Sequence, residues 1–496
     1  MAGVTAENDV VLRGGRVVDP ESGRDEIADV AISGGRVAAI GPDVGRGQAE
    51  LDATGHVVTA GFIDLHSHVN GIAGLRLQAL DGVTTALELE AGVTPVATAY
   101  EHAAAEGRPV NFGFASSWAL ARMEAVAGIT LDGSLAAFLA NIARPGWQSQ
   151  ARPAQVTAVL SRLSADLADG ALGIGILVGY APGSDPAEYL QVAALAAEAG
   201  VPTFTHARDM IEMVPGAAID GAEEIVRAAE QTGARMHYCH VNSTSQRYVD
   251  RVLGLVSRAQ QAGARVSTEA YPYGSGMTGI GAAFLAPERL GERGLTPSSL
   301  TYAPTGEQVA SVQRLRELRA SDPAGLAIIR LLDEDDPADL RLLMSSLEFP
   351  DAIVASDAMP LTWSGTAPDP MAWPLRGDAV THPRTAGTFC RALRMLAGPD
   401  GPLGLMESLR RCSLLPARLL QDHVPGMRAK GRLQPGSDAD IVVFDPATVT
   451  DQATYSASTR PSTGVRHVLV NGTPVVRDAQ VVAGALPGRP VRATVR

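Results

Sequence analysis

The pair His66 and His68, which follows the apolar run GFIDL, constrains the fold more than any other feature. Side chains two residues apart on a β-strand lie on the same face, so both imidazoles can point at one ligand. Three later strand-like runs also end in a metal-binding residue type: VPTFTH at His206, ARMHYCH at His240 and DAIVASD at Asp357. In a barrel of parallel strands the carboxyl ends meet at one face, where catalytic residues gather. The sequence therefore predicts four imidazoles and a carboxylate around one point.

The central part of the chain alternates strand-like runs with Ala- and Leu-rich runs. The latter include PAEYLQVAALAAEAG and GAEEIVRAAEQTG, whose apolar residues recur every three to four positions, as in helices. Repeated βα units predict an α/β fold, a (β/α)8 TIM-like barrel. The eight expected strands are GFIDL, GVTTALELE, PVNFGFAS, ALGIGILV, VPTFTH, ARMHYCH, ARVSTEAYP and DAIVASD.

Both chain ends contain short strand-like runs separated by glycine turns, including the hairpin signal Asn471-Gly472. We expect residues 1–60 and 425–496 to form one small β-sandwich built from both ends, around a metal-dependent barrel at 61–424. The stretch from about 277 to 350 is far longer than an ordinary connection, and we expect it to be a lid or binding element.

Composition narrows the choice of partner and compartment. The net charge of −13 argues against nucleic acid, because binding to phosphates needs clustered Lys and Arg. No stretch offers about 18 uninterrupted apolar residues, and the first residues lack a basic segment followed by an apolar one, so we expect no membrane partner. Cys239, Cys390 and Cys412 form no CxxC pair, which favours a reducing, cytoplasmic location. A small molecule is the expected partner, and assembly into a homo-oligomer stays open.

Several motifs resemble those of a known family. GFIDLHSH, the two later histidines, the aspartate after the last strand and the split sandwich resemble the amidohydrolase superfamily. HYCHVNSTS, EAYPYGSG and SDAMP followed by THPRTAGTF are similar to motifs of the N-acyl-D-amino-acid deacylases, also called D-aminoacylases, and above all of D-glutamate deacylases. The resemblance covers nearly the whole chain. It implies zinc-dependent hydrolysis of the amide that joins an acyl group to a D-amino acid.

The residue that bridges the metal positions departs from the family pattern. Many amidohydrolases use a carbamylated lysine on the fourth strand, but the only lysine here is Lys430, in the predicted sandwich. The D-aminoacylases use a cysteine after the second strand, where this chain has Ala91. Glu90 stands next to it and Glu88 precedes it on the same strand face, and buried carboxylates need cations or shared protons. We predict Glu90 as the bridging or third metal ligand, with Glu88 as the alternative.

Oxygen and nitrogen ligands predict Zn²⁺, bound as one or two ions, with Mn²⁺, Co²⁺ or Fe²⁺ as other candidates. One ion is expected between His66 and His68 and the other between His206 and His240, with Glu90 contacting both. The resemblance implies that the second of these positions binds its ion more tightly.

Asp357 matches the family's catalytic aspartate, and we expect it to act as general base and then as general acid. In that mechanism a metal lowers the pKa of bound water, and the resulting hydroxide attacks the amide carbonyl. Asp357 accepts the proton and returns it to the leaving amine.

The resemblance also implies part of the substrate pocket. Arg384, in His-Pro-Arg, matches the family arginine that holds the substrate α-carboxylate, a task suited to a guanidinium fork. Tyr271 matches the tyrosine that assists at the same carboxylate. The family's lysine is replaced by Asn242, which we expect to hydrogen-bond the substrate instead, with Ser275 and Thr278 as alternatives.

Three alternatives to an N-acyl-D-amino-acid deacylase, with D-glutamate as the first product considered, remain open. One is a hydrolase of cyclic amides or imides, like dihydroorotase or hydantoinase. Another is an enzyme that makes or cleaves a C–N bond in a specialised metabolite. The third is a non-catalytic scaffold, which predicts eroded ligands, whereas every metal-binding histidine and the aspartate are present.

Overall fold

The computed structural model describes residues 7–69 and 71–495. Residues 1–6 of the predicted sandwich segment, residue 70 and the last residue of the chain lie outside this description. Of the described helices, none combines the length and the apolar character needed to span a lipid bilayer.

A sheet of eight parallel strands forms the barrel, in the order β17-β12-β11-β10-β9-β8-β7-β6. A parallel bridge between Ser67 and Ala358 joins its two edges. Every strand begins within one of the eight predicted runs, although β7 and β8 extend past the ends of theirs, so the predicted α/β barrel is confirmed. The strands are β6 (Phe62–Asp64), β7 (Val83–Val93), β8 (Asn111–Ser117), β9 (Ile174–Ile176), β10 (Pro202–Thr205), β11 (Arg235–Tyr238), β12 (Val266–Ala270) and β17 (Ile353–Val354).

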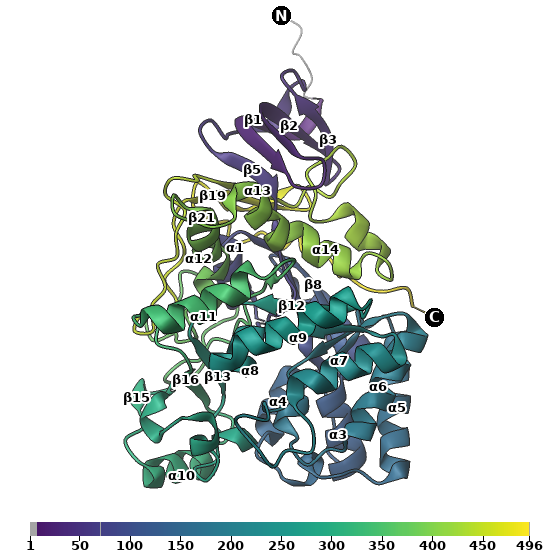
Figure 1. Cartoon of the computed structure of the whole chain (residues 1–496). Helices are drawn as coiled ribbons and strands as arrows, with labels where there is room; N and C mark the ends of the chain where they lie inside the picture. The colour runs from purple at the N-terminus through teal and green to yellow at the C-terminus, as the bar shows by residue number, and fades with distance from the viewer. Residues whose placement is uncertain (1–6, 70, 496) are drawn as a thin grey trace, which may run out of the picture.

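Helices follow the strands and cover the outside of the barrel (Figure 1). Their ends carry local signals: Asp185 and Asp220 cap the first turns of α6 and α7, and Gly200 and Gly233 end them in the left-handed conformation. The longer ones are α1 (Ile72–Leu80), α2 (Val96–Glu106), α3 (Trp118–Ala127), α5 (Pro153–Ala168), α6 (Pro186–Ala199), α7 (Gly221–Thr232), α9 (Val249–Gln261), α11 (Pro337–Glu348) and α12 (Arg384–Ala397). The shorter ones are α4 (Leu135–Asn141), α8 (Val241–Ser245), α13 (Gly404–Leu409) and α14 (Leu415–Leu420).

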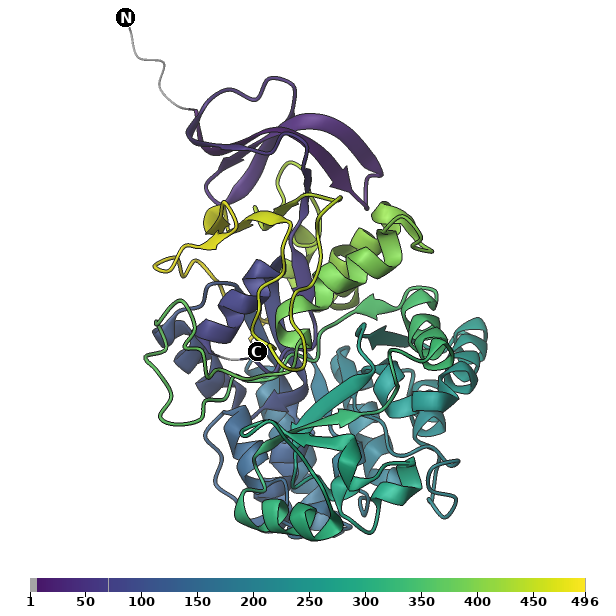
Figure 2. The same ribbon diagram turned by 90° about the vertical axis from the view of Figure 1, so that its left-hand side faces the viewer.

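Strands from both chain ends share one nine-stranded sheet beside the barrel (Figure 2). The N-terminal strands β1–β3 and the C-terminal strands β18–β21 meet where β5 pairs antiparallel with β18. The last residues return to the barrel, where the Val491 amide donates to the Phe112 carbonyl at 2.7 Å. The strands are β1 (Asn8–Asp19), β2 (Arg24–Ser33), β3 (Arg36–Gly41), β4 (Gly47–Asp52), β5 (Val57–Ala60), β18 (Ile441–Phe444), β19 (Val465–Val470), β20 (Thr473–Arg477) and β21 (Gln480–Val481).

The long stretch between β12 and β17 contains a third sheet, which is antiparallel, in the order β13-β16-β14-β15. It is packed with helix α10 (Val312–Ser321) at one end of the barrel (Figure 1). Side chains from this segment reach the cavity described below. The strands are β13 (Ser275–Gly279), β14 (Leu300–Tyr302), β15 (Glu307–Gln308) and β16 (Leu326–Arg330).

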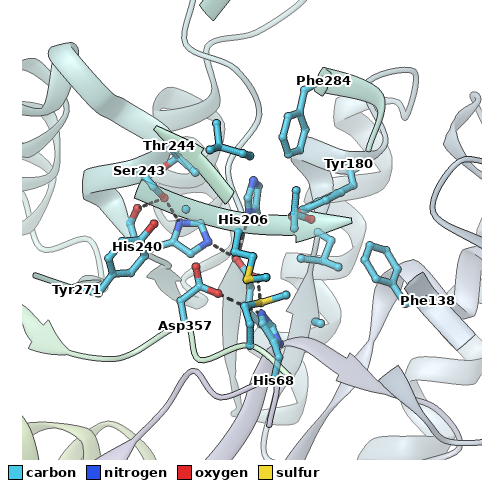
Figure 3. Close-up of a pocket in the computed structure, with 18 of the residues that line it drawn as sticks. His68, Phe138, Tyr180, His206, His240, Ser243, Thr244, Tyr271, Phe284 and Asp357 are labelled. Carbon is cyan, nitrogen blue, oxygen red and sulfur yellow. Dashed lines mark hydrogen bonds and ion pairs between the residues drawn. The ribbon is translucent and has the colours of Figure 1, made fainter. Parts of the chain in front are cut away.

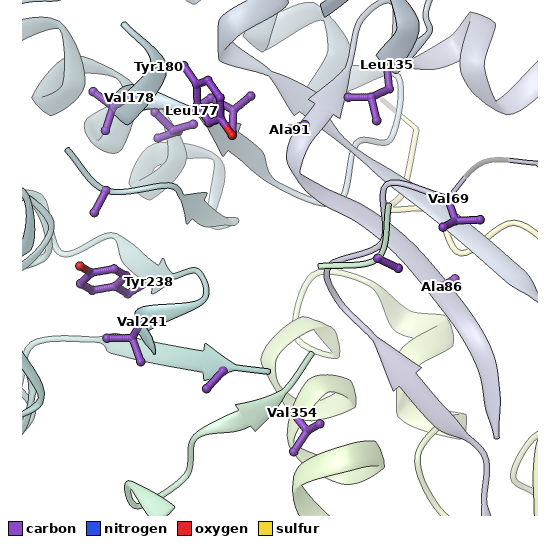
Figure 4. Close-up of a cluster of buried hydrophobic side chains, with 14 of the residues drawn as sticks. Val69, Ala86, Ala91, Leu135, Leu177, Val178, Tyr180, Tyr238, Val241 and Val354 are labelled. Atoms are coloured by element: carbon purple, nitrogen blue, oxygen red, sulfur yellow. The ribbon is translucent and has the colours of Figure 1, made fainter. Parts of the chain in front are cut away.

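The hydrophobic core continues to the strand ends. Ala91, Leu135, Leu177 and Tyr180 belong to one buried cluster with side chains from the barrel wall (Figure 4). The same four residues line the cavity at the carboxyl ends of the strands. Because close-packed side chains cannot shift freely, the core fixes the shape of this cavity wall.

Candidate metal centre and substrate cavity

The structure brings together all six residues predicted for metal binding and proton transfer. Each lies on a barrel strand or at most a few residues beyond the carboxyl end of one, and each is at most 8% exposed. His68, His206, His240 and Asp357 face one another in the cavity (Figure 3). The six are His66 and His68 after β6, Glu90 on β7, His206 after β10, His240 after β11 and Asp357 after β17.

The Glu90 carboxylate lies between the two histidine pairs, with one oxygen toward each. Its Oε2 is 3.2 Å from His66 Nε2 and 3.7 Å from His68 Nε2. Its Oε1 is 2.6 Å from His240 Nε2 and 3.1 Å from His206 Nδ1. This is the placement expected of a bridging ligand.

The donor atoms suit divalent cations. His66, His68 and Glu90 form one group whose ligand atoms all lie within 4.8 Å of one another, and Glu90, His206 and His240 form a second. Nε2 atoms of His66 and His68 approach to 3.1 Å, so a proton or a cation must lie between them. Burial alone would raise the pKa of Glu90, but the surrounding imidazoles outweigh it and hold that pKa well below its usual range. Imidazole and carboxylate ligands of this kind are typical of zinc sites.

Two further carboxylates hold the outer nitrogens of the first histidine pair. Glu269 Oε1 is 2.5 Å from His66 Nδ1, and its other oxygen is 3.0 Å from His237 Nε2. Glu88 Oε2 is 2.8 Å from His68 Nδ1. In both histidines the Nδ1–H group is thereby engaged and Nε2 is left to face Glu90, which orients each ring for a metal. The structure thus places Glu88 beyond His68, while Glu90 lies between the pairs.

Asp357 lies between the histidines and Arg384. Its Oδ1 is 3.3 Å from His68 Nε2, and its Oδ2 is 2.9 Å from Arg384 Nη2. Its backbone has a φ of 51°, a left-handed conformation that is costly for a residue other than glycine. Buried Asp64 supports this segment, because it accepts hydrogen bonds from the backbone amides of Ser356 and His66 at 3.0 and 3.2 Å.

Arg384 opens helix α12 and is fully buried, behind the cavity wall. Its guanidinium stacks over the Tyr271 ring at 4.7 Å, and its Nη1 has no hydrogen-bond partner among the described residues. Gly276 lines the cavity in front of it: a Cβ there would lie 3.5 Å from the Tyr271 hydroxyl and 3.8 Å from Arg384 Nη1. Glycine at this position therefore leaves an opening toward both groups. A buried guanidinium with a free N–H group has the chemistry to bind an anion.

The structure places Asn242 elsewhere than expected. Its Nδ2 donates to the backbone carbonyls of Tyr271 and Tyr273 at 3.2 and 3.4 Å, and it is not among the described residues that line the cavity. Its neighbour Ser243 lines the cavity instead and contacts His240 Nδ1 at 3.0 Å. The reason is local: His240 has a φ of 31°, so α8 starts in a new direction after the strand ends. Of the two alternatives, Thr278 lies at the cavity.

The cavity, whose empty space is about 720 Å³ when the part open to solvent is included, has two unlike ends. Tyr271, His240 and Asp357 lie toward one end, and Phe138, Tyr180 and Phe284 toward the other (Figure 3). Arg293 lies at the apolar end, where its guanidinium pairs with Asp209 and stacks over Phe284 at 4.2 Å. The apolar lining comprises Leu135, Phe138, Leu139, Leu177, Met277, Phe284, Ile329, Leu331 and Met359.

Four residues of the site were not singled out from the sequence: Glu269, Ser243, Gly276 and Arg293. Glu269 could have been found by the pattern that predicted the metal ligands, because it is an acidic residue near the carboxyl end of strand β12. For Gly276 and Arg293 no local pattern exists, since their place depends on how the long segment after β12 folds back over the barrel.

Comparisons with known proteins show which family the chain resembles. Residues 49–476 match the model of the amidohydrolase family. The N-acyl-D-glutamate deacylase of Alcaligenes xylosoxydans xylosoxydans is 30% identical over 98% of this chain and 96% of that protein. The D-aminoacylase of the same organism is 28% identical over 97% of each chain. The crystal structure of N-acyl-D-glutamate deacylase from Bordetella bronchiseptica, complexed with zinc and a phosphonate inhibitor, is 26% identical; it superposes with a TM-score of 0.74 over 98% of this chain and all of that one.

Proposed function

Because this chain belongs to the amidohydrolase family, we propose that it hydrolyses the amide bond of an N-acyl-D-amino acid to a carboxylate and a free amino acid. The observation that carries the proposal is the position of Asp357 between the histidines and Arg384. One carboxylate is thus within reach of both the metal ligands and the guanidinium that would hold the substrate.

Zinc is the proposed cofactor. His66 and His68 would hold an ion on one side of Glu90, and His206 and His240 on the other, with one Glu90 oxygen for each side. A divalent cation supplies Lewis acidity there, because it polarises a carbonyl and makes a water molecule more acidic.

Asp357 moves the proton. Its Oδ1 faces the histidines and accepts a proton from the attacking water, while Arg384 holds Oδ2 in place. The water oxygen bonds to the amide carbon, the C–N bond breaks, and Asp357 delivers the proton to the departing nitrogen. The products are an amine and a carboxylic acid, which ionises to the carboxylate by releasing the second proton of the water, and Asp357 returns to its ionised state.

Arg384 and Tyr271 would bind the α-carboxylate of the substrate through the opening beside Gly276. The charge-assisted hydrogen bond to Nη1 would satisfy a donor that is otherwise buried without a partner among the described residues. The names of the relatives indicate D-amino acids, with D-glutamate and D-aspartate as the first products to test.

A panel of substrates tests the proposal. Zinc-loaded protein should release the free amino acid from N-acyl-D-glutamate or N-acyl-D-leucine much faster than from their L-enantiomers. Turnover of dihydroorotate or hydantoin alone would instead establish the cyclic-amide alternative. A cytoplasmic location, the oligomeric state and the domain limits near residues 60 and 425 stay predictions.

A further inference from the structure

A second cavity begins at His68 and runs between helices α2 and α4, and its empty space is about 960 Å³ when the part open to solvent is included. Three residues line both it and the substrate cavity: His68, Leu135 and Leu139. The side chains of a proposed metal ligand and of two leucines on α4 therefore lie between the two cavities.

The position of His68 indicates which part of the substrate lies near this second cavity: the α-carboxylate or the acyl group. Asp357 directs Oδ2 toward Arg384 and Oδ1 toward His68, so these two residues lie on opposite sides of the proposed base. In Figure 3 Tyr271 likewise lies on the far side of Asp357 from Phe138, a side chain of α4. A substrate whose α-carboxylate is held near Arg384 and Tyr271 would thus direct its acyl group toward His68 and α4.

The walls of this second cavity suit a hydrocarbon chain. Most of them are apolar, and several are small enough to leave a trough. The charged lining includes the buried Arg108, which pairs with Glu106 at 2.6 Å. The apolar and small residues are Val93, Ala99, Ala103, Phe114, Gly133, Leu135, Ala136, Leu139 and Pro360. Apolar surface that encloses a ligand on several sides favours alkyl groups through the hydrophobic effect.

We propose that this second cavity, the acyl groove, binds the alkyl chain of the substrate's acyl group, so that the preferred substrates carry linear acyl chains longer than acetyl. The proposal rests on the proposed deacylase function. It assigns the acyl group to the side of α2 and α4.

A chain-length series tests it. Zinc-loaded enzyme is assayed with the acetyl, butanoyl, hexanoyl and octanoyl derivatives of one D-amino acid. We expect kcat/KM to rise about two- to fourfold for each added methylene until the groove is filled. A flat or falling series would overturn the acyl groove while leaving deacylation itself established. No hydrolysis at any chain length would instead refute the proposed function.

Two variants test whether the chain-length preference arises in the acyl groove. Ala136 is exposed on α4 and lines only the groove, so Ala136→Trp should obstruct it without disturbing the core. We expect kcat/KM for the octanoyl substrate to fall about tenfold, the effect of losing about two buried methylenes, with acetyl turnover unchanged. Ala99→Leu obstructs the groove from the α2 wall and should act in the same way.

Ala104→Trp is the matched control, because Ala104 is exposed on α2 and is not among the described residues that line the groove. It should leave both substrates unaffected. Equal losses for acetyl and octanoyl substrates in Ala136→Trp and Ala99→Leu, or no loss in either, would contradict the acyl groove. Unchanged zinc content in all three variants shows that the metal centre is intact.

Discussion

His66 and His68 are each held at both ring nitrogens by carboxylates, whereas Phe138 and Leu139, at the apolar end of the cavity, are held by packing. On the first side, buried charges compensate one another, and removal of one leaves others without a partner. On the second side the contacts are apolar and non-directional. We therefore expect changes at the metal side to abolish function and changes at the apolar side to alter substrate choice.

The largest effect is expected from Glu90→Ala. Loss of the carboxylate removes an oxygen ligand from both histidine pairs, so zinc affinity should fall about a hundredfold or more. Equilibrium dialysis followed by metal analysis measures this, with the exposed Glu124→Ala as control. Full zinc occupancy in Glu90→Ala would indicate that Glu88, and not Glu90, is the carboxylate ligand of the metal.

Asp357→Asn should separate chemistry from metal binding. The amide can still contact Arg384 and the histidines, but it cannot accept the proton, so kcat should fall about 10²- to 10⁴-fold. Zinc content and thermal stability should stay close to those of the unchanged protein. Near-normal turnover would exclude Asp357 as the base.

Glu269→Gln should have a smaller effect that acts through His66. The substitution keeps the size of the side chain but removes the negative charge that orients the ring, and zinc affinity should fall about 10- to 100-fold. Titration against a chelator of known affinity gives the value. The exposed Glu230→Gln is the control, and an unchanged affinity in Glu269→Gln would show that the contact does not tune the metal.

Gly276→Ala should have the smallest effect of the four and should leave zinc binding unchanged. The added methyl group would occupy the opening in front of Arg384 Nη1 and the Tyr271 hydroxyl. KM should rise about tenfold for substrates with an α-carboxylate, the loss of about one charge-assisted hydrogen bond, with kcat little changed. An N-acyl amine without a carboxylate is the matched substrate, and an equal rise for it would argue against a carboxylate site.

The sequence predicts the metal side of the cavity better than the apolar side, because the two sides are built from different kinds of contact. His206 and His240 close short apolar strands, and strand ends in a parallel barrel meet at one face, so local sequence patterns are enough to place them. Glu90 follows from the same alternation along β7. The positions of these three residues can be predicted without knowing any contact between distant parts of the chain.

The apolar side depends on long-range packing instead. Phe284 and Arg293 reach the cavity because the segment after β12 forms its own sheet and returns to the barrel, which no local period encodes. Asn242 shows a subtler limit: the left-handed turn at His240 directs Ser243, rather than Asn242, into the cavity. A positive φ at a histidine has no sequence signature comparable to that of glycine.

The central claim is that Glu90 joins two histidine pairs into one metal centre. Crystallography of the zinc-loaded protein, with anomalous data collected at the zinc absorption edge, tests this most directly. The account predicts zinc peaks beside Glu90, at one or both of two positions: between its Oε2 and the pair His66 and His68, and between its Oε1 and the pair His206 and His240. Zinc coordinated by these histidines without either Glu90 oxygen, or bound away from them, would contradict it.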